Sequence, residues 1–179
     1  LMESLDDPYS EYYTAEELNE LTEQTQGIYY GIGAYVSMDS DTNLPKISGV
    51  IEGAPAADVD LRANDIIYEV DGESTAGKTL TEAVNMIRGE AGTTVDLTIV
   101  RQGAGDYLHV TVERAKVESP TVKYEMLDDN MAYIQIVEFD DVTIDQFTDA
   151  LATVKGSGME GLILDLRGNP GGSLDAVVR

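Results

Sequence analysis

The chain has 179 residues and carries 34 acidic side chains against 11 basic ones, which gives a formal net charge of −23. This balance argues against nucleic acid as a partner, because binding a phosphate backbone requires basic patches that displace counterions. With no Cys and a single His, the chain has no disulfides, thiolate zinc sites, cysteine nucleophiles or multi-histidine metal sites. The 42% of apolar residues suffices for a buried core, and no apolar run is long enough to span a membrane.

The start of the chain is acidic and predicts one short helix. Residues 1–24 contain eight acidic side chains and no basic one. Thr14 and Glu17 have the spacing of a capping box, and two leucines follow on one helical face. We expect a helix over residues 14–25 whose acidic side chains lie in solvent.

From residue 27 to residue 116 the pattern changes to short strands around one helix. Strands are expected at residues 47–51 and 65–70. Alternation of apolar and polar side chains predicts a hairpin formed by residues 95–99 and 108–112. The region is therefore expected to be an α+β domain.

The helix of this domain is expected just after the first two strands. A capping box at Thr79 and Glu82 begins it, and Gly89 is expected to end it. Three apolar side chains then lie on one helical face, namely Leu80, Val84 and Ile87.

A connector interrupted by Pro120 leads into a second unit. Strands are expected at residues 122–127 and 131–139, around an acidic turn. Thr143 and Gln146 are expected to cap the helix that follows.

Residues 161–166 form a nearly continuous apolar run, which is typical of a parallel strand buried on both faces. Strand, helix and strand are the beginning of an α/β layer, and both ends of the chain look cut, so we expect a piece of a longer protein. The expected parts are a helical leading segment, an α+β domain and the start of an α/β layer, over residues 1–26, 27–116 and 117–179.

Two glycines flank Ile32 where the chain enters a strand. The string Gly31-Ile32-Gly33-Ala34 permits a tight loop whose N–H groups face one point, and such a loop can hold a carboxylate. A peptide ending there would extend along residues 34–36 as an added strand, with the apolar helix face as the other wall. The alternative is an ordinary turn into a strand.

A second glycine-rich string, residues 164–172, directly follows the apolar run, where α/β proteins place their sites. Pro170 stiffens the turn, and Gly171 and Gly172 leave backbone N–H groups uncovered that can stabilise an oxyanion. The alternative is a plain strand-to-helix turn.

Metal motifs are incomplete. Asp39, Asp41 and Asn43 begin like a calcium loop, but Leu44 and Val50 stand where the loop needs Gly and Glu. We predict no metal site and no cofactor.

Taken together, the strings resemble the carboxyl-terminal processing proteases, or tail-specific proteases, of serine peptidase family S41. The resemblance covers essentially the whole chain in order. Asp60 and Asn64 stand at two positions where the family usually has glycine, and both types tolerate positive φ. The matching strings are residues 5–13, 31–34, 54–67, 87–89 and 162–172.

The resemblance implies an α+β fold with a PDZ domain, a small partly open β-barrel with helices, followed by an incomplete α/β segment of the protease core. It implies a serine endopeptidase that recognises C-terminal tails through the PDZ domain and cuts with a Ser–Lys dyad. The implied tail-binding residues are Gly31, Ile32, Gly33, Ala34, Val36, Leu80, Val84 and Ile87, and the implied oxyanion-hole donors are Gly171 and Gly172.

The family's Ser and Lys motifs lie beyond the Gly-Gly turn and have no counterpart here, so we assign no nucleophile and expect this chain to be inactive. The alternative function is a stand-alone PDZ adaptor that binds peptides without cutting them. The resemblance implies substrate tails as partners and a bacterial extracytoplasmic, membrane-associated or secreted location. An incomplete sheet also predicts self-association or segment swapping.

Overall fold

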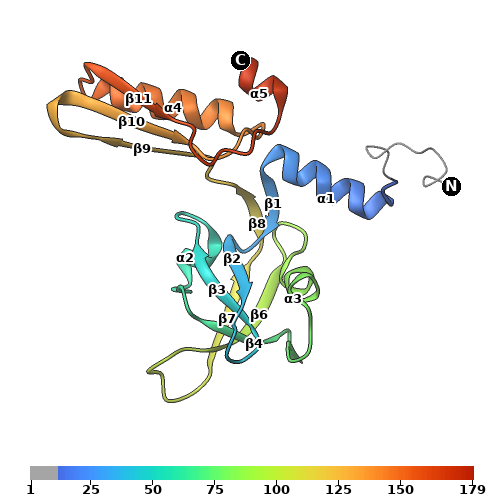
Figure 1. Cartoon of the computed structure of the whole chain (residues 1–179). Helices are drawn as coiled ribbons and strands as arrows, with labels where there is room; N and C mark the ends of the chain where they lie inside the picture. The colour runs from blue at the N-terminus through green and yellow to red at the C-terminus, as the bar shows by residue number, and fades with distance from the viewer. Residues whose placement is uncertain (1–11) are drawn as a thin grey trace. The chain divides into compact units, whose positions relative to one another are not determined.

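The computed structural model describes residues 12–179 (Figure 1). They form two compact units, Tyr29–Val117 and the described part of Leu1–Ile28 together with Glu118–Arg179. The helix expected near the start of the chain, α1 (Ala15–Gln26), thus groups with the C-terminal region. The leading string of the family resemblance lies largely outside the described residues.

The Tyr29–Val117 unit is built on one antiparallel sheet with the strand order β2-β3-β4-β6-β7, in which β5 also pairs with β4. Two helices, α2 (Pro55–Asp58) and α3 (Leu80–Ile87), accompany it. The strands are β2 (Ala34–Met38), β3 (Pro45–Val50), β4 (Ile66–Val70), β5 (Glu73–Ser74), β6 (Thr94–Val100) and β7 (Leu108–Glu113). Because β2 is an edge strand, one of its sides is free of any strand partner among the described residues.

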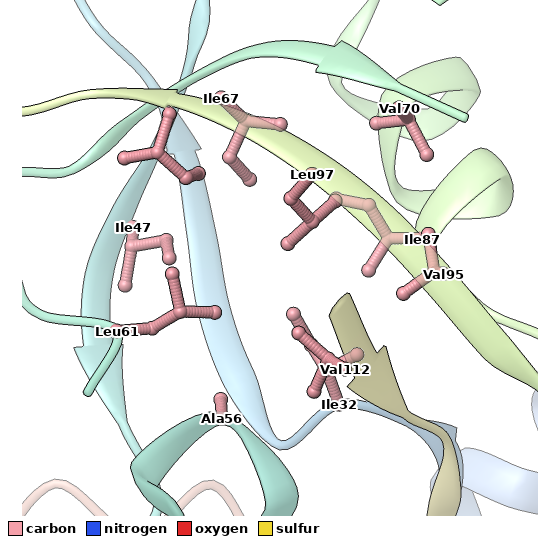
Figure 2. Packing of buried hydrophobic residues seen from close by; sticks show 11 residues of the cluster. Ile32, Ile47, Ala56, Leu61, Ile67, Val70, Ile87, Val95, Leu97 and Val112 are labelled. Carbon is pink, nitrogen blue, oxygen red and sulfur yellow. The ribbon is translucent and has the colours of Figure 1, made fainter. Parts of the chain in front are cut away.

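The core of this unit comes from the alternation seen in the sequence. Val95, Leu97 and Ile99 of β6 are buried on one face, and β7 pairs with β6 as the expected hairpin. They belong to one buried cluster with Ile67 of β4 and Ile47 of β3. Figure 2 shows this packing around Val95 and Leu97.

Asp60 and Asn64, where the family that the chain resembles usually has glycine, both have positive φ. Asp60 and Asn64 have φ of 61° and 74°, which confirms that these residue types adopt positive φ here. The loop is fixed by the buried Asp65, whose carboxylate accepts hydrogen bonds from Arg101 Nε at 2.7 Å and from the Arg62 N–H at 2.8 Å.

The other unit has a three-stranded sheet with β10 (Met131–Ile136) at its centre. β9 (Val122–Met126) pairs with it antiparallel, and β11 (Gly161–Asp165) pairs with it parallel. Helix α4 (Thr143–Gly156) packs on this sheet. The buried contacts join Ala150 and Val154 of the helix to Ala132 and Ile134 of the sheet.

The expectation that β11 is buried on both faces is wrong for the described residues. β10 is its single strand neighbour there, so β11 is an edge strand. Leu162, Ile163 and Leu164 are 39%, 43% and 47% exposed, which is consistent with this edge position.

The expected capping box of α4 is also wrong. The N-cap is Val142, with no side-chain cap, and Thr143 already lies in the helix. The Thr143 hydroxyl donates to the Thr121 hydroxyl at 2.8 Å, and Gln146 accepts the N–H of Thr121 at 2.9 Å. Both side chains therefore bind the connector instead of the helix start.

Two short strands mark where the chain passes from one unit to the other. β1 (Ile28–Gly31) pairs with β8 (Ala115–Glu118) as a two-stranded sheet. Beside it, the N–H of Ser119 donates to the carbonyl of Gly27 at 2.8 Å. The remaining elements are a 3₁₀ turn, η2 (Asp128–Asn130), and α5 (Leu174–Val178). No helix in the described range combines the length and the apolar character needed to cross a bilayer.

Candidate functional site

The loop between β1 and β2 directs its carbonyl groups to one side. The carbonyl of Ile32 accepts the N–H of Ala56 at 2.8 Å, and that of Gly33 accepts the N–H of Ile51 at 2.9 Å. In a trans peptide the N–H points opposite to the C=O of the same unit. The N–H groups of Gly33 and Ala34 therefore point away from α2, and they form a candidate anion site.

The loop requires glycine at one position in particular. Gly33 has φ of +75°, and a Cβ there would overlap that of Ala54. Ile32 anchors the loop because its side chain is buried in the core of the unit. The sequence expectation of a tight Gly-Ile-Gly loop thus has a physical basis.

The edge of β2 next to this loop keeps the regular spacing of a strand. The pairing of β2 with β3 shifts between Tyr35 and Val36, which pair with Gly49 and Ile47. The extra residue, Ser48, therefore lies on β3, and its hydroxyl donates to the Tyr35 carbonyl at 3.2 Å. The irregularity is on the inner strand, so β2 can pair with an added strand at its free edge.

Helix α3 packs against β2 and begins with the expected capping box. The Glu82 carboxylate accepts the N–H of Thr79 at 2.7 Å, and the Thr79 hydroxyl accepts the N–H of Glu82 at 3.3 Å. These bonds hold the pKa of Glu82 below its usual value. The start of the helix is thereby fixed by its own sequence.

The predicted tail-binding residues fall into two groups. Ile87 is buried in the same core as Ile32, with Ala34 and Val36 half-buried against it. Leu80 and Val84, one turn apart on α3, remain outside that buried cluster, and Leu80 is 37% exposed. The structure thus brings loop, strand edge and helix together, with Ile87 beneath the surface rather than on it.

One cation near the loop was given no role from the sequence. The Arg88 guanidinium lies over the ring of Tyr29 at 5.3 Å from the centroid. A Cβ on Gly31 would lie 3.8 Å from Arg88 Cγ, so this residue is adjacent to the loop. The Ile87-Arg88-Gly89 string is part of the family resemblance, but the string alone does not predict that Arg88 lies beside the Gly31–Ala34 loop.

The second predicted site, the glycine-rich turn, packs against the chain after β10. Phe139 donates its N–H to the Gly171 carbonyl at 2.9 Å, and a Cβ on Gly172 would overlap the Phe139 carbonyl. Gly171 donates its own N–H to Asn169 Oδ1 at 2.7 Å. Of the two predicted oxyanion donors, Gly171 is therefore engaged within the turn in this conformation.

A buried carboxylate lies where β11 meets this turn. Asp165 binds Arg167 Nη2 at 2.7 Å and also accepts a hydrogen bond from the Tyr133 hydroxyl. The bonds from Arg167, then those from Tyr133, hold the pKa of Asp165 far below its usual value. Asp165 is thus a fixed charge that braces the turn and is unsuited to proton transfer near neutral pH.

Comparison with known proteins yields matches in both units. Residues 46–101 match the family model of the PDZ domain, and residues 130–179 match that of peptidase family S41. The carboxy-terminal processing protease CtpA of Bacillus subtilis is 38% identical over 178 residues, covering 99% of this chain and 38% of that protein. The carboxy-terminal-processing protease of Bartonella bacilliformis is 35% identical over 176 residues, covering 96% of this chain and 40% of that protein.

A solved structure matches nearly the whole chain. The photosystem II D1 C-terminal processing protease superimposes with a TM-score of 0.59 and 25% identity, covering 98% of this chain and 50% of that one. The chain therefore spans half or less of the length of these proteins.

Proposed function

Because this chain belongs to peptidase family S41 and contains a PDZ domain, we propose that it is the tail-recognising part of a carboxy-terminal processing protease. In this proposal the Tyr29–Val117 unit binds the C-terminus of a substrate protein. The observation that supports it is the convergence of three features, namely the outward amides of the loop, the free edge of β2 and the apolar surface of α3.

The proposed binding mode follows from these features. The terminal carboxylate of the tail accepts hydrogen bonds from the N–H groups of Gly33 and Ala34, and its backbone adds a strand beside β2. Apolar side chains of the tail pack against Leu80 and Val84, and the last of them lies toward the Ile87 end of α3. Hydrogen bonds to a charged group contribute roughly 1.5–3 kcal/mol each, so the free carboxylate is the main recognition element.

This mode predicts that the full chain distinguishes a free carboxylate from an amide. A fluorescein-labelled peptide ending in valine should bind at least about tenfold more tightly than the same peptide with a C-terminal amide. Fluorescence anisotropy measures both affinities. Equal affinities would overturn the proposed carboxylate site.

Two glycine variants provide a matched control. Gly33→Ala should abolish binding, because it combines positive φ with overlap at Ala54. Gly53→Ala has a similar φ of +74° but open space around it, so it should retain binding at a comparable cost in backbone strain.

We assign the cutting step to the Ser–Lys dyad of the family, whose motifs have no counterpart in this sequence. The chain is therefore expected to bind tails and to leave them intact. Mass spectrometry of a peptide incubated with the repurified chain measures this directly, and cleavage that persists through repurification would contradict it. The proposed location is extracytoplasmic in a bacterium, as the family resemblance implies, and fractionation of cells that produce the whole protein tests it.

The alternative, a stand-alone peptide-binding adaptor, is less favoured because residues 130–179 match a peptidase family. The reading frame that encodes the chain separates the two possibilities. Continuation into a Ser motif and a Lys favours the protease, and a stop codon directly after Arg179 favours the adaptor.

We also propose that the chain associates with itself through β11. This strand forms an edge of its sheet and presents exposed apolar side chains. Unpaired edges of this kind pair with other strands.

A further inference from the structure

Arg114 follows β7 and has a nearly buried guanidinium, since its side chain is only 10% exposed. Nε donates to the carbonyl of Ile87 at 2.8 Å, and Nη2 donates to that of Met86 at 3.2 Å. Nη1 donates to the carbonyl of Thr94 at 2.7 Å and to the hydroxyl of Thr93 at 3.1 Å. One side chain thus joins the end of α3 to the start of β6.

These bonds replace the cap that the sequence predicts. The last carbonyls of a helix have no partner within the helix, and a glycine at positive φ often ends it. Here the C-cap of α3 is Arg88, which is extended with φ of −65° and ψ of 163°. Gly89 has ordinary φ and instead leaves room for the guanidinium, because a Cβ on it would lie 2.9 Å from Arg114 Nε.

The chemistry of this cap requires arginine. The nearest carboxylate oxygen, Asp71 Oδ2, is 4.0 Å from Nη2 and belongs to an exposed side chain, so carbonyl groups are the main acceptors. The positive charge also favours the negative end of the helix dipole. A lysine ammonium is a single point of donors and cannot serve acceptors spread around a planar fork.

The capped end of α3 is the end next to the candidate anion site. Gly31 of the loop lies beside Arg88, with 3.8 Å between its Cβ position and Arg88 Cγ. Ile87, whose carbonyl Arg114 binds, packs in the same core as Ile32 of the loop. A shift of this helical turn would therefore change the spacing between helix and loop.

We infer that Arg114 is a positioning residue for tail binding: by capping α3 it sets the width of the groove where the last residue of the tail binds. The inference rests on the proposed function of the same site. Arg114 acts through α3 and needs no contact with the peptide.

The test compares Arg114→Lys with the unchanged full chain. Valine-ended and alanine-ended peptides with free carboxylates are the probes, and fluorescence anisotropy measures both affinities. The affinity for the valine-ended peptide should fall about tenfold, and the ratio of the two affinities should approach one because the pocket no longer fits the larger side chain. A side chain needed for stability alone would leave this ratio unchanged in protein that circular dichroism shows to be folded.

Arg101→Lys is the matched control. Arg101 also binds a buried carboxylate, with 2.7 Å between its Nε and Asp65 Oδ1, and it donates to the exposed Asp60 carbonyl at 2.7 Å. These acceptors lie outside α3 and the Gly31–Ala34 loop. This variant should lower stability while keeping the ratio of affinities.

If Arg114→Lys does not fold, Gly89→Ala tests the same inference. Its added Cβ would lie 2.9 Å from Arg114 Nε and would displace the guanidinium while leaving the arginine in place. Folded variants that keep the affinity and the ratio of the unchanged chain would overturn the inference and leave the proposed function standing. If the unchanged chain binds free acid and amide equally, the proposed function fails and the inference falls with it.

Discussion

Among the residues that the structure describes, three buried carboxylates have different surroundings. Asp65 and Asp165 each bind an arginine, at 2.7 Å in both cases. Asp140 is 5% exposed and lies among acidic neighbours, and burial, followed by the charges of Glu138 and Asp141, raises its pKa to about 6. The folded structure therefore disfavours the ionised form of the Asp140 carboxyl, which is the main form near neutral pH.

The raised pKa of Asp140 predicts a pH-dependent stability. An unfolded Asp titrates near pH 3.9, so the stability of the folded unit falls as the pH rises from about 4 through 6, where the folded carboxyl ionises. Asp140→Asn removes this charge, and at pH 8 it should raise the free energy of unfolding by about 1–2 kcal/mol. Urea unfolding followed by circular dichroism at pH 4 and pH 8 measures the difference.

The gain should vanish at pH 4, where the carboxyl of the unchanged chain is largely protonated. Asp145→Asn, at an exposed position of α4, is the control for the loss of one negative charge. A gain of equal size at both pH values would refute the explanation by ionisation.

At the scale of elements, two similar motifs behave differently. The Thr-x-x-Glu pattern at Thr79 caps α3 as expected, whereas the Thr-x-x-Gln pattern at Thr143 does not cap α4. Local spacing could predict that a helix starts near each threonine. It could not predict that the Thr143 hydroxyl would instead bind the hydroxyl of Thr121, 22 residues earlier. That hydrogen bond forms only when the two segments pack together.

The exposed β11 strand carries the prediction of self-association. Leu164→Lys places a charge on this edge strand and should shift the chain toward the monomer, because charged side chains block edge pairing. Sedimentation velocity at several concentrations measures the effect. Leu127→Lys, at a 40% exposed position beyond β9, is the matched control. A chain that is strictly monomeric at every concentration would count against the prediction.

At the scale of the whole molecule, the negative charge is unevenly distributed. Residues 29–117 carry seven basic against fourteen acidic side chains, and the rest of the chain carries four against twenty. Association through β11 would bring together the more acidic unit of each copy. It should therefore strengthen as salt screens this repulsion, an effect that the same sedimentation experiment detects.

The division into units shows what periodicity can and cannot predict. Alternation in β6 and β7 identified their hairpin, and the apolar run identified β11 as a strand parallel to its neighbour. Periodicity does not report long-range partners, so the pairing of β1 with β8 was not predicted. Arg114 was missed for the same reason, because its acceptors lie 20 to 28 residues away in the sequence.

The pairing of β1 with β8 has a consequence for how such proteins can change. The chain enters and leaves the Tyr29–Val117 unit side by side, so the stretch between the two strands closes on itself. Because the two ends of this unit are adjacent, it can be replaced by a domain of another length. The replacement adds little loop-closure entropy and leaves the rest of the protein undistorted. Recombination at these two strands would give the rest of the protein a new recognition module in a single step.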